Sequence, residues 1–202
     1  MPSNKRLNLD GIFRQNIVLM SGLVTAPIIV AATTAERALV LTLSFLMISY
    51  SSILICRLIP RKIVYTVRIL LYAAVAAVMY IPTALLLGAL FPETSAEVSI
   101  YIEILVVNSL LLAKTETRFY AEPFGVMAVD ALVYVAGYAM AAFAVGIIRE
   151  FLAFGTLFGL RLCDVPMPAA KSPFFGFILV GVLAAVCRAA AHRNAPAGKG
   201  AR

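Results

Sequence analysis

Long blocks of aliphatic and aromatic residues, separated by short polar segments, constrain the fold of this chain more than any other feature. Of its 202 residues, 62% are hydrophobic and only 13% are charged, whereas a soluble domain carries roughly 25% charged residues. Such a chain cannot cover its surface with polar groups. We therefore predict one compact helical bundle inside a lipid bilayer, without a separate soluble domain, and we exclude a soluble enzyme.

Six apolar blocks approach the length that crosses a membrane, since about 20 residues of helix span roughly 30 Å of hydrocarbon. These blocks are residues 16–34, 38–56, 67–90, 98–113, 127–148 and 174–191. The sequence thus predicts an all-α polytopic membrane protein with a six-helix transmembrane domain over 16–191. Residues 1–15 are expected at the cytoplasmic face or membrane interface, and the small, polar, basic tail 192–202 is expected to be disordered.

Lysine and arginine indicate which way the chain crosses the membrane, because cytoplasmic loops are enriched in both. If both termini are cytoplasmic, thirteen of the seventeen basic residues fall in cytoplasmic segments, and the exceptions are Arg37, Arg149, Arg161 and Lys171. We therefore predict that both termini lie in the cytoplasm. The net charge of +7 does not indicate nucleic-acid binding, because the basic residues lie between apolar blocks and at the chain ends rather than on an aromatic–basic surface.

Two polar strings of similar sequence suggest an internal repeat. PIIVAATTAERA at 27–38 resembles NSLLLAKTETRF at 108–119, at an offset of 81 residues. The identical pairs are Ala32 with Ala113, Thr34 with Thr115, and Arg37 with Arg118. Each string ends the first span of a three-helix half, 16–90 or 98–191. Because three is odd, the second half enters the membrane from the opposite side, which is the signature of an inverted repeat.

The first span of each half departs from a regular membrane helix, and we expect both to be short or broken. The span at 16–34 contains Gly22 and Pro27, and the span at 98–113 has only 16 residues, about 24 Å of helix. Interrupted spans at matching places in two inverted halves indicate a site near the membrane midplane. Small residues and proline also serve close helix packing, and the sequence leaves both explanations open.

Polar residues near the ends of these spans are candidates for an ion path or for ordering the helix ends. They are Glu36, Arg37, Asn108, Lys114, Glu116, Arg118 and Asp130. A carboxylate near the bilayer centre is costly, so it is usually paired or functional. Glu36 and Glu116 therefore either line an ion path or lie at the interface, paired with the arginines that follow them. Asn108 either hydrogen-bonds unwound backbone or packs between helices.

Four further positions carry alternatives that the sequence does not separate. Asp130 either caps the start of the fifth span, where a helix dipole favours a carboxylate, or belongs to an ion path. Arg149 and Glu150 close the fifth span, where a structural role is favoured over a role in transport. Because adjacent residues point to different helix faces, we expect each to have its own partner. Glu103 is expected to reach the membrane interface or to contact a partner.

Cysteine and histidine give no sign of a metal or redox site. Cys56, Cys163 and Cys187 are far apart and form no CxxC pattern, so we expect neither a zinc site nor a disulfide framework. His192 is the single histidine and is expected to be a solvated tail residue. The sequence also contains no phosphate-binding glycine loop.

Three segments resemble a known family, the RnfE/NqrD-type membrane subunits of the Rnf and Na⁺-pumping Nqr complexes. The segments are TTAERAL at 33–39, VVNSLLLAKTE at 106–116 and MAVDALVYVAGYAMAAFAVGIIREFLAFGTLFG at 127–159. The third is the most specific, since its Asp130, Gly137-Tyr138, Arg149-Glu150, Gly155 and Gly159 fall where the family has them. The resemblance covers about 16–160, roughly three quarters of the chain.

This resemblance implies a subunit that is not catalytic alone. Such subunits sit in a prokaryotic cell membrane beside a homologous, oppositely oriented RnfA/NqrE-type subunit and with subunits that carry flavin and iron–sulfur groups. Rnf complexes pass electrons from ferredoxin to NAD and Nqr complexes from NADH to quinone, and both move Na⁺ or H⁺. The alternative is a diverged, non-redox transporter or assembly scaffold of the same fold.

One departure from the family affects the expected cofactor. Family members supply one cysteine from each half to a 2Fe–2S cluster shared with the partner subunit. The matching positions here are Ala26 and Ser109, and neither provides the thiolate that holds such a cluster. We therefore expect that this chain binds no cluster.

Overall fold

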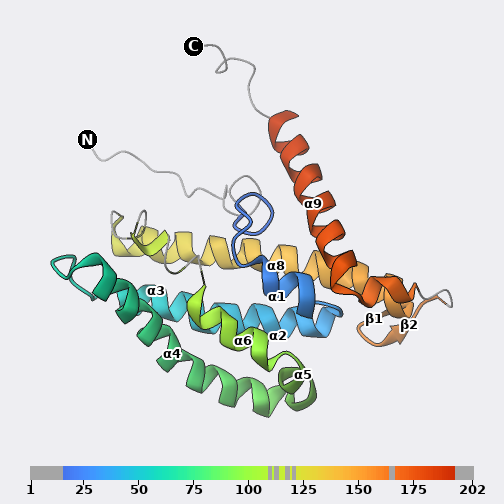
Figure 1. Ribbon diagram of the computed structural model, residues 1–202, viewed down its shortest axis with the longest axis horizontal. Coiled ribbons are helices and arrows are strands. Elements are labelled where there is room, and N and C mark those ends of the chain that lie inside the picture. The colour runs from blue at the N-terminus through green and yellow to red at the C-terminus, as the bar shows by residue number, and fades with distance from the viewer. Residues whose placement is uncertain are drawn as a thin grey trace.

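The computed structural model describes residues 16–108, 111, 114–116, 119, 122–163 and 167–193, and it is a bundle of helices of very unequal length (Figure 1). The elements in chain order are α1 (Thr25–Ala31), α2 (Ala35–Phe45), the π-helix η2 (Leu46–Tyr50), α3 (Ser51–Cys56), α4 (Tyr65–Leu90), α5 (Pro92–Glu97), α6 (Ser99–Ile104), the 3₁₀ helix η3 (Leu105–Val107), α8 (Phe124–Phe154), β1 (Thr156–Leu157), β2 (Leu160–Arg161), the 3₁₀ helix η5 (Pro168–Lys171) and α9 (Pro173–Arg193).

Four helical stretches within the described residues are long and apolar enough to cross a membrane. They are Ala35–Cys56, Tyr65–Leu90, Phe124–Phe154 and Pro173–Ala190. They coincide with the predicted second, third, fifth and sixth spans, so the long apolar helices predicted there are confirmed. The first stretch joins α2 to α3 through η2, a wider helical turn of a kind frequently found at functional sites.

The predicted first and fourth spans are not continuous helices, which corrects their boundaries. In place of a helix over 16–34, residues 16–24 form turns, and α1 has only seven residues, about 10 Å. Within 98–113, α6 has six residues and gives way to η3, after which Asn108 is extended. Left-handed backbone at Gly22 (φ 66°) and Val24 (φ 56°) separates these turns from α1, because a helix cannot contain it.

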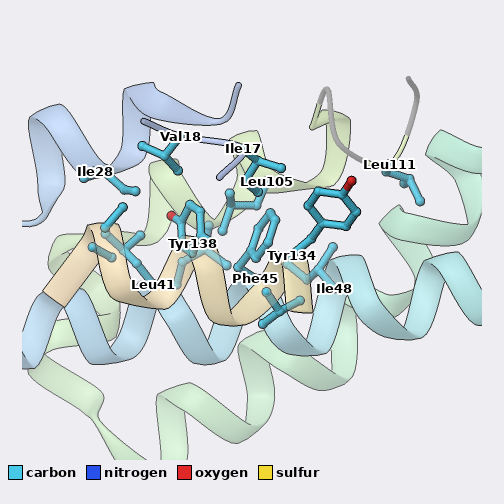
Figure 2. Packing of buried hydrophobic residues seen from close by; sticks show 14 of the residues in the cluster. Ile17, Val18, Ile28, Leu41, Phe45, Ile48, Leu105, Leu111, Tyr134 and Tyr138 are labelled. Carbon is cyan, nitrogen blue, oxygen red and sulfur yellow. The ribbon is translucent and has the colours of Figure 1, made fainter. Parts of the chain in front are cut away.

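The core of the bundle lies between α2 and α8 (Figure 2). Phe45 of α2 stacks on Tyr138 of α8, with ring centroids 4.1 Å apart. Ile17 and Val18, before α1, and Leu105, after α6, lie beside these rings in the same buried cluster. Helices α1 and α6 also contact each other. Each interrupted segment therefore has one side buried against protein, and such contact helps non-helical backbone to be tolerated at membrane depth.

Helices α4 and α9 form the outer flanks of the bundle. Helix α4 packs against α3 and η2, and α9 packs against α1, η5 and α8. Most residues of both helices are exposed, and α9 leaves the bundle at an angle (Figure 1). Exposed side chains on them are largely apolar, as Leu85 and Phe177 illustrate. Such faces suit contact with lipid.

A small antiparallel hairpin, β1–β2, joins α8 to the segment before α9 and was not predicted from the sequence. Its register pairs Leu157 with Leu160. Helix α8 stops at Gly155, which has φ 66°, the usual left-handed end of a helix. The Gly155 carbonyl accepts hydrogen bonds from the amides of Leu162 and Cys163, so this one residue fixes where the hairpin starts and where the chain returns.

We expect Gly155→Ala to destabilise the protein more than Gly159→Ala. Both positions have positive φ, but an added Cβ at Gly155 would collide with the carbonyl of Cys163, whereas at Gly159 it would meet nothing within 4 Å. Gly159→Ala should cost only the backbone strain, roughly 1–2 kcal/mol. Thermal unfolding of both purified variants in mild detergent measures the difference, and equal losses would contradict the collision.

Candidate functional site

The first chain interruption lies between α1 and α2. Its residues 32–34 leave the last carbonyls of α1 and the first amides of α2 without partners inside a helix. Thr34 is extended, and its Oγ1 accepts a hydrogen bond from the amide of Arg37 at 3.2 Å. Thr34 thus satisfies one of these amides, and the amide of Thr33 donates to the carbonyl of Ala31 at 2.8 Å. Residues far along the chain bind further backbone groups of the interruption.

Arg149 of α8 donates to the carbonyl groups on the α1 side of this interruption. Its guanidinium is fully buried, and Nη1 donates to the carbonyl of Ile29 at 2.7 Å and to that of Ala32 at 3.5 Å. The remaining donors reach the segment before α9. They bond the carbonyls of Ala170 at 3.0 Å, Lys171 at 2.9 Å and Ser172 at 3.2 Å. A positive charge is favourable beside such carbonyl-rich helix ends.

Glu150, the next residue, accepts hydrogen bonds from groups on the α2 side of the interruption. Its Oε2 accepts from the amide of Ala35 at 2.8 Å, at the first residue of α2. Its Oε1 accepts from the Thr156 hydroxyl at 3.3 Å and from the Gly159 amide at 3.2 Å, both in the hairpin. Arg149 and Glu150 thus have separate partners, and together they hold α1, α2, the hairpin and the start of α9 to the end of α8.

Asn108 bridges the second interruption. Its Nδ2 donates to the carbonyl of Leu105 at 2.6 Å and to the hydroxyl of Ser49 at 3.0 Å, and its Oδ1 accepts from the amide of Leu111 at 2.8 Å. Asn108 therefore bonds backbone on both sides of the interruption and ties it to η2, which contains Ser49. Ser109 lies outside the described residues.

Glu116 lies beyond this interruption and binds the start of α4. Arg68 donates to both of its carboxylate oxygens at 2.6 Å, and the Tyr72 hydroxyl donates to Oε1 at 2.6 Å. Burial alone would raise the pKa of Glu116, but the hydrogen bonds from Arg68 and Tyr72, with the charges of Arg68 and Arg61, outweigh it and lower the pKa below its ordinary value of 4.5. Glu116 is therefore ionised at neutral pH.

We expect Glu116→Gln to lower the thermal unfolding midpoint at pH 7, because the ion pair with Arg68 is lost. A carboxylate whose pKa is lowered in the folded protein stabilises the fold above its unfolded pKa and loses this effect as the pH falls through the folded pKa. The wild-type advantage should thus persist down to pH 5 and shrink only below 4.5. Glu93→Gln, at an exposed position in α5, is the matched control, and an advantage that vanished at pH 6 would contradict this assignment.

The pairing expected for Glu36 and Arg37 is wrong. Arg37 pairs with Glu97, with Nη2 to Oε2 at 2.6 Å, and also donates to Thr33 Oγ1 at 2.6 Å. Glu36 is exposed, and its carboxylate accepts a hydrogen bond from Thr94. Consecutive helix residues point in different directions, so each finds its own partner in the segment after α4.

Of the other candidates, Asp130 is buried six residues after the start of α8 at Phe124. The capping explanation for Asp130 is therefore wrong, because an N-terminal cap acts only within the first turn. The ammonium of Lys114 lies 5.6 Å from the ring centre of Tyr134. Glu103 is exposed and accepts a hydrogen bond from Tyr80 at 3.3 Å. Arg118 lies outside the described residues.

Asn16 is a buried polar residue that sequence reasoning missed. Its Nδ2 donates to the carbonyl of Gly137 at 2.8 Å, and its Oδ1 accepts from the amides of Val18 and Leu19. It therefore attaches the non-helical segment before α1 to α8, much as Asn108 attaches the segment after α6 to η2. An asparagine at the edge of an apolar block was the available signal.

A pocket of about 280 Å³ lies beside the first interruption. Its lining residues are Thr34, Glu36, Glu150, Phe154, Thr156, Phe158 and Gly159. Two carboxylates and two threonine hydroxyls thus share one pocket with two phenylalanine rings. Because Glu150 also binds the first amide of α2, the pocket reaches the interruption itself, and its oxygen atoms are suited to cations or water.

Comparison with known proteins places the chain among membrane subunits of redox complexes. Residues 5–184 match the family model described as "Rnf-Nqr subunit, membrane protein". The chain is 26% identical over 160 residues to one subunit of the Na(+)-translocating NADH-quinone reductase of Yersinia enterocolitica, covering 79% of this chain and 77% of that protein. It is 26% identical over 201 residues to one subunit of the ion-translocating oxidoreductase complex of Yersinia pseudotuberculosis, covering 92% of this chain and 86% of that protein.

Proposed function

Because the chain belongs to the Rnf-Nqr family of membrane subunits, we propose that it is an integral subunit of a membrane complex that couples electron transfer to the movement of Na⁺ or H⁺. Its relatives carry the names of subunits of such ion-translocating oxidoreductases. The observation that carries the proposal is that α1 and α6, both too short to cross a bilayer, meet inside the bundle. Membrane transporters bind ions at interrupted helices of this kind.

The subunit has two inverted three-helix halves and both termini in the cytoplasm of a prokaryotic cell. Counting the interrupted segments, the chain crosses the membrane six times. In this topology α8 runs outward, so Glu150 near its end and Glu36 at the start of α2 belong to the outer face. Arg68 at the start of α4 and its partner Glu116 belong to the inner face. The two interruptions thus have carboxylates on opposite sides of the bilayer.

Cysteine labelling of intact cells tests this topology. Lys62 and Glu93 are both exposed and lie at opposite ends of α4, which makes them a matched pair. In a chain lacking its native cysteines, a membrane-impermeant maleimide should label Glu93→Cys from outside and Lys62→Cys only after permeabilisation. Labelling of both from the same side would refute the inverted arrangement.

Ion movement would use the polar groups at the two interruptions in turn. Glu36 and Glu150 line the outer pocket, and Glu116 and Asp130 are the inner carboxylates. Asn108 and Ser49 lie between them at the second interruption. Alternate exposure of this path to the two faces, driven by the redox state of the complex, would couple electron transfer to ion movement. A homologous subunit of opposite orientation is the expected neighbour.

This chain supplies no thiolate ligand to an iron–sulfur cluster in the complex. Ala26, on α1, has no ligand atom, and Ser109 carries a hydroxyl in place of the thiolate that such clusters require. The three cysteines do not replace them, since Cys56 is buried in α3, Cys163 follows the hairpin and Cys187 lies on α9. Replacing all three with serine should leave any iron–sulfur EPR signal of the purified complex unchanged, and loss of a signal would contradict this.

Coupled transport by the intact complex is the direct test of the function. Inverted membrane vesicles should take up Na⁺ or acidify when supplied with NADH or reduced ferredoxin, and vesicles from cells lacking this chain should not. Purification through a tag on this chain should bring down subunits that contain flavin and iron–sulfur groups. If electron transfer continues in the deletion strain while ion uptake is lost, this result would place the chain on the ion path.

The substitution of both cluster cysteines favours one alternative, a non-redox transporter or assembly scaffold of the same fold. The same purification separates the two. A homo-oligomer without redox subunits would support the alternative and reject membership of an electron-transfer complex.

A further inference from the structure

The hairpin β1–β2 presents large apolar side chains outward. Phe158, Leu160 and Leu162 are 60%, 72% and 61% exposed. Exposure of such large apolar side chains to water is unfavourable. We propose that this hairpin is a membrane anchor whose three apolar side chains insert among the phospholipids at the boundary between head groups and acyl chains.

The position of the hairpin places it at a membrane surface. It begins directly after α8 and is followed by α9, and both helices are long and apolar enough to span a bilayer. Phe158 is four residues beyond Phe154, the last residue of α8, so the chain can carry it at most about 14 Å from that helix end. The interfacial layer on each side of the hydrocarbon core is about 5–8 Å thick. The tether therefore keeps Phe158 within about 14 Å of the end of α8, close enough for its side chain to enter this layer.

Aromatic rings and basic residues surround the hairpin in the pattern of a membrane interface. Phe154 and Phe174, at the facing ends of α8 and α9, are both exposed. The ammonium of Lys171 lies 4.2 Å from the ring centre of Phe154, and Lys171 and Arg161 are exposed. Basic side chains that reach toward head groups mark the ends of membrane segments, and phenylalanine is a common apolar residue of interfacial segments.

The turn itself indicates that Phe158 has a use other than folding. Both central residues have positive φ, 50° at Phe158 and 78° at Gly159, the geometry of a type I′ turn. Asparagine or aspartate followed by glycine is preferred there, and phenylalanine is strained. Part of Phe158 lines the pocket beside Glu150, but 60% of the residue stays exposed. Insertion of this exposed part into lipid would compensate for the strain.

Hydrogen bonds fix the hairpin to the end of α8 and so keep its apolar side chains directed outward. Glu150 accepts hydrogen bonds from Thr156 and Gly159, and the carbonyl of Gly155 binds the returning strand at Leu162. The same Glu150 carboxylate holds the first amide of α2. Anchoring the hairpin in lipid would therefore fix the outer edge of the first interruption. This inference depends on the chain spanning a membrane and not on its redox function.

Tryptophan fluorescence tests the anchor, because the chain contains no tryptophan. The full-length chain with Phe158→Trp is reconstituted in vesicles of phosphatidylcholine brominated at shallow or deep acyl positions. We expect a blue-shifted emission that shallow bromines quench more than deep ones. Val78→Trp, on the exposed face near the middle of α4, should be quenched more by deep bromines. Glu93→Trp, in α5, should be quenched least, and a Phe158→Trp emission like that of Glu93→Trp would overturn the proposal.

Photocrosslinking in the assembled complex separates lipid from a protein partner. Phe158 is replaced with p-benzoylphenylalanine, and the complex is irradiated in native membranes. Crosslinks to phospholipid, seen as an added lipid mass on this chain, are expected. A crosslink to another subunit would show that the hairpin is a subunit contact and would overturn the proposal, whether or not the complex transports ions.

Discussion

Replacing Arg149 with methionine is expected to lower the free energy of unfolding by at least about 3 kcal/mol and to remove most of the assembled protein from the membrane. The guanidinium is fully buried and donates to carbonyls from both α1 and the segment before α9. Each buried acceptor that loses its donor costs about 1–3 kcal/mol. Methionine fills a similar volume but donates nothing, so several such losses should add.

Denaturation in mild detergent with increasing SDS measures this loss, and Arg188→Met is the matched control. Arg188 is exposed and donates to one carbonyl, that of Met20, at 3.2 Å, so its replacement should have little effect. Arg149→Lys keeps the charge but cannot reach both segments, and it should fall between the two. If Arg149→Met were as stable as Arg188→Met, the proposed role of Arg149 in holding α1 to the start of α9 would be wrong.

The second large effect is expected for Gly176→Val, which should separate α9 from α1. An added Cβ at Gly176 would collide with the backbone carbonyl of Ile29 and approach Arg149 Nη1 at 3.3 Å. The obstructing atom is backbone and cannot rotate away, and Ile29 is also an acceptor for Arg149. Overpacking of this kind typically costs about 1–3 kcal/mol, and we expect a loss at the top of that range.

Gly181→Val is the matched control on the same helix. A Cβ at Gly181 meets nothing within 4 Å, so this variant should unfold near the wild-type midpoint. Thermal unfolding of both variants in the same detergent gives the comparison. Equal stability of the two would mean that α9 can move away from α1 at no cost, which would contradict the close packing described here.

The sequence predicted a continuous helix correctly wherever an apolar run was long enough to cross a membrane. The four spans that became α2–α3, α4, α8 and α9 are uninterrupted runs, and lipid leaves a continuous helix as the simplest way to satisfy their backbone. The two leading spans carried a weaker signal, since Gly22, Pro27 and Asn108 suggested an interruption without locating it. Their helical parts, α1 and α6, are shorter than any composition-based boundary indicated.

The sequence identified most residues of the candidate site but not their hydrogen-bond and ion-pair partners. Glu36, Asn108, Glu116 and Arg149 were all singled out, but the pairing of Glu36 with Arg37 was wrong because Glu97, sixty residues later, holds Arg37. Asp130 was placed too near a helix start because the span boundary lay inside α8. Asn16 was not singled out at all. For Arg37 and Asn16, the deciding contact joins segments that are far apart in the sequence.

The sequence by itself determined that this chain lies in a membrane, which runs form its long helices and which polar residues stand out against them, because the cost of polar groups in lipid acts on every residue locally. Only the tertiary structure decided how the interruptions are held. Hydrogen bonds such as Arg149 to Ile29 and Glu150 to Ala35 span more than a hundred residues. They form because α8 packs along α2 and α1, an arrangement set by the fit of the whole bundle.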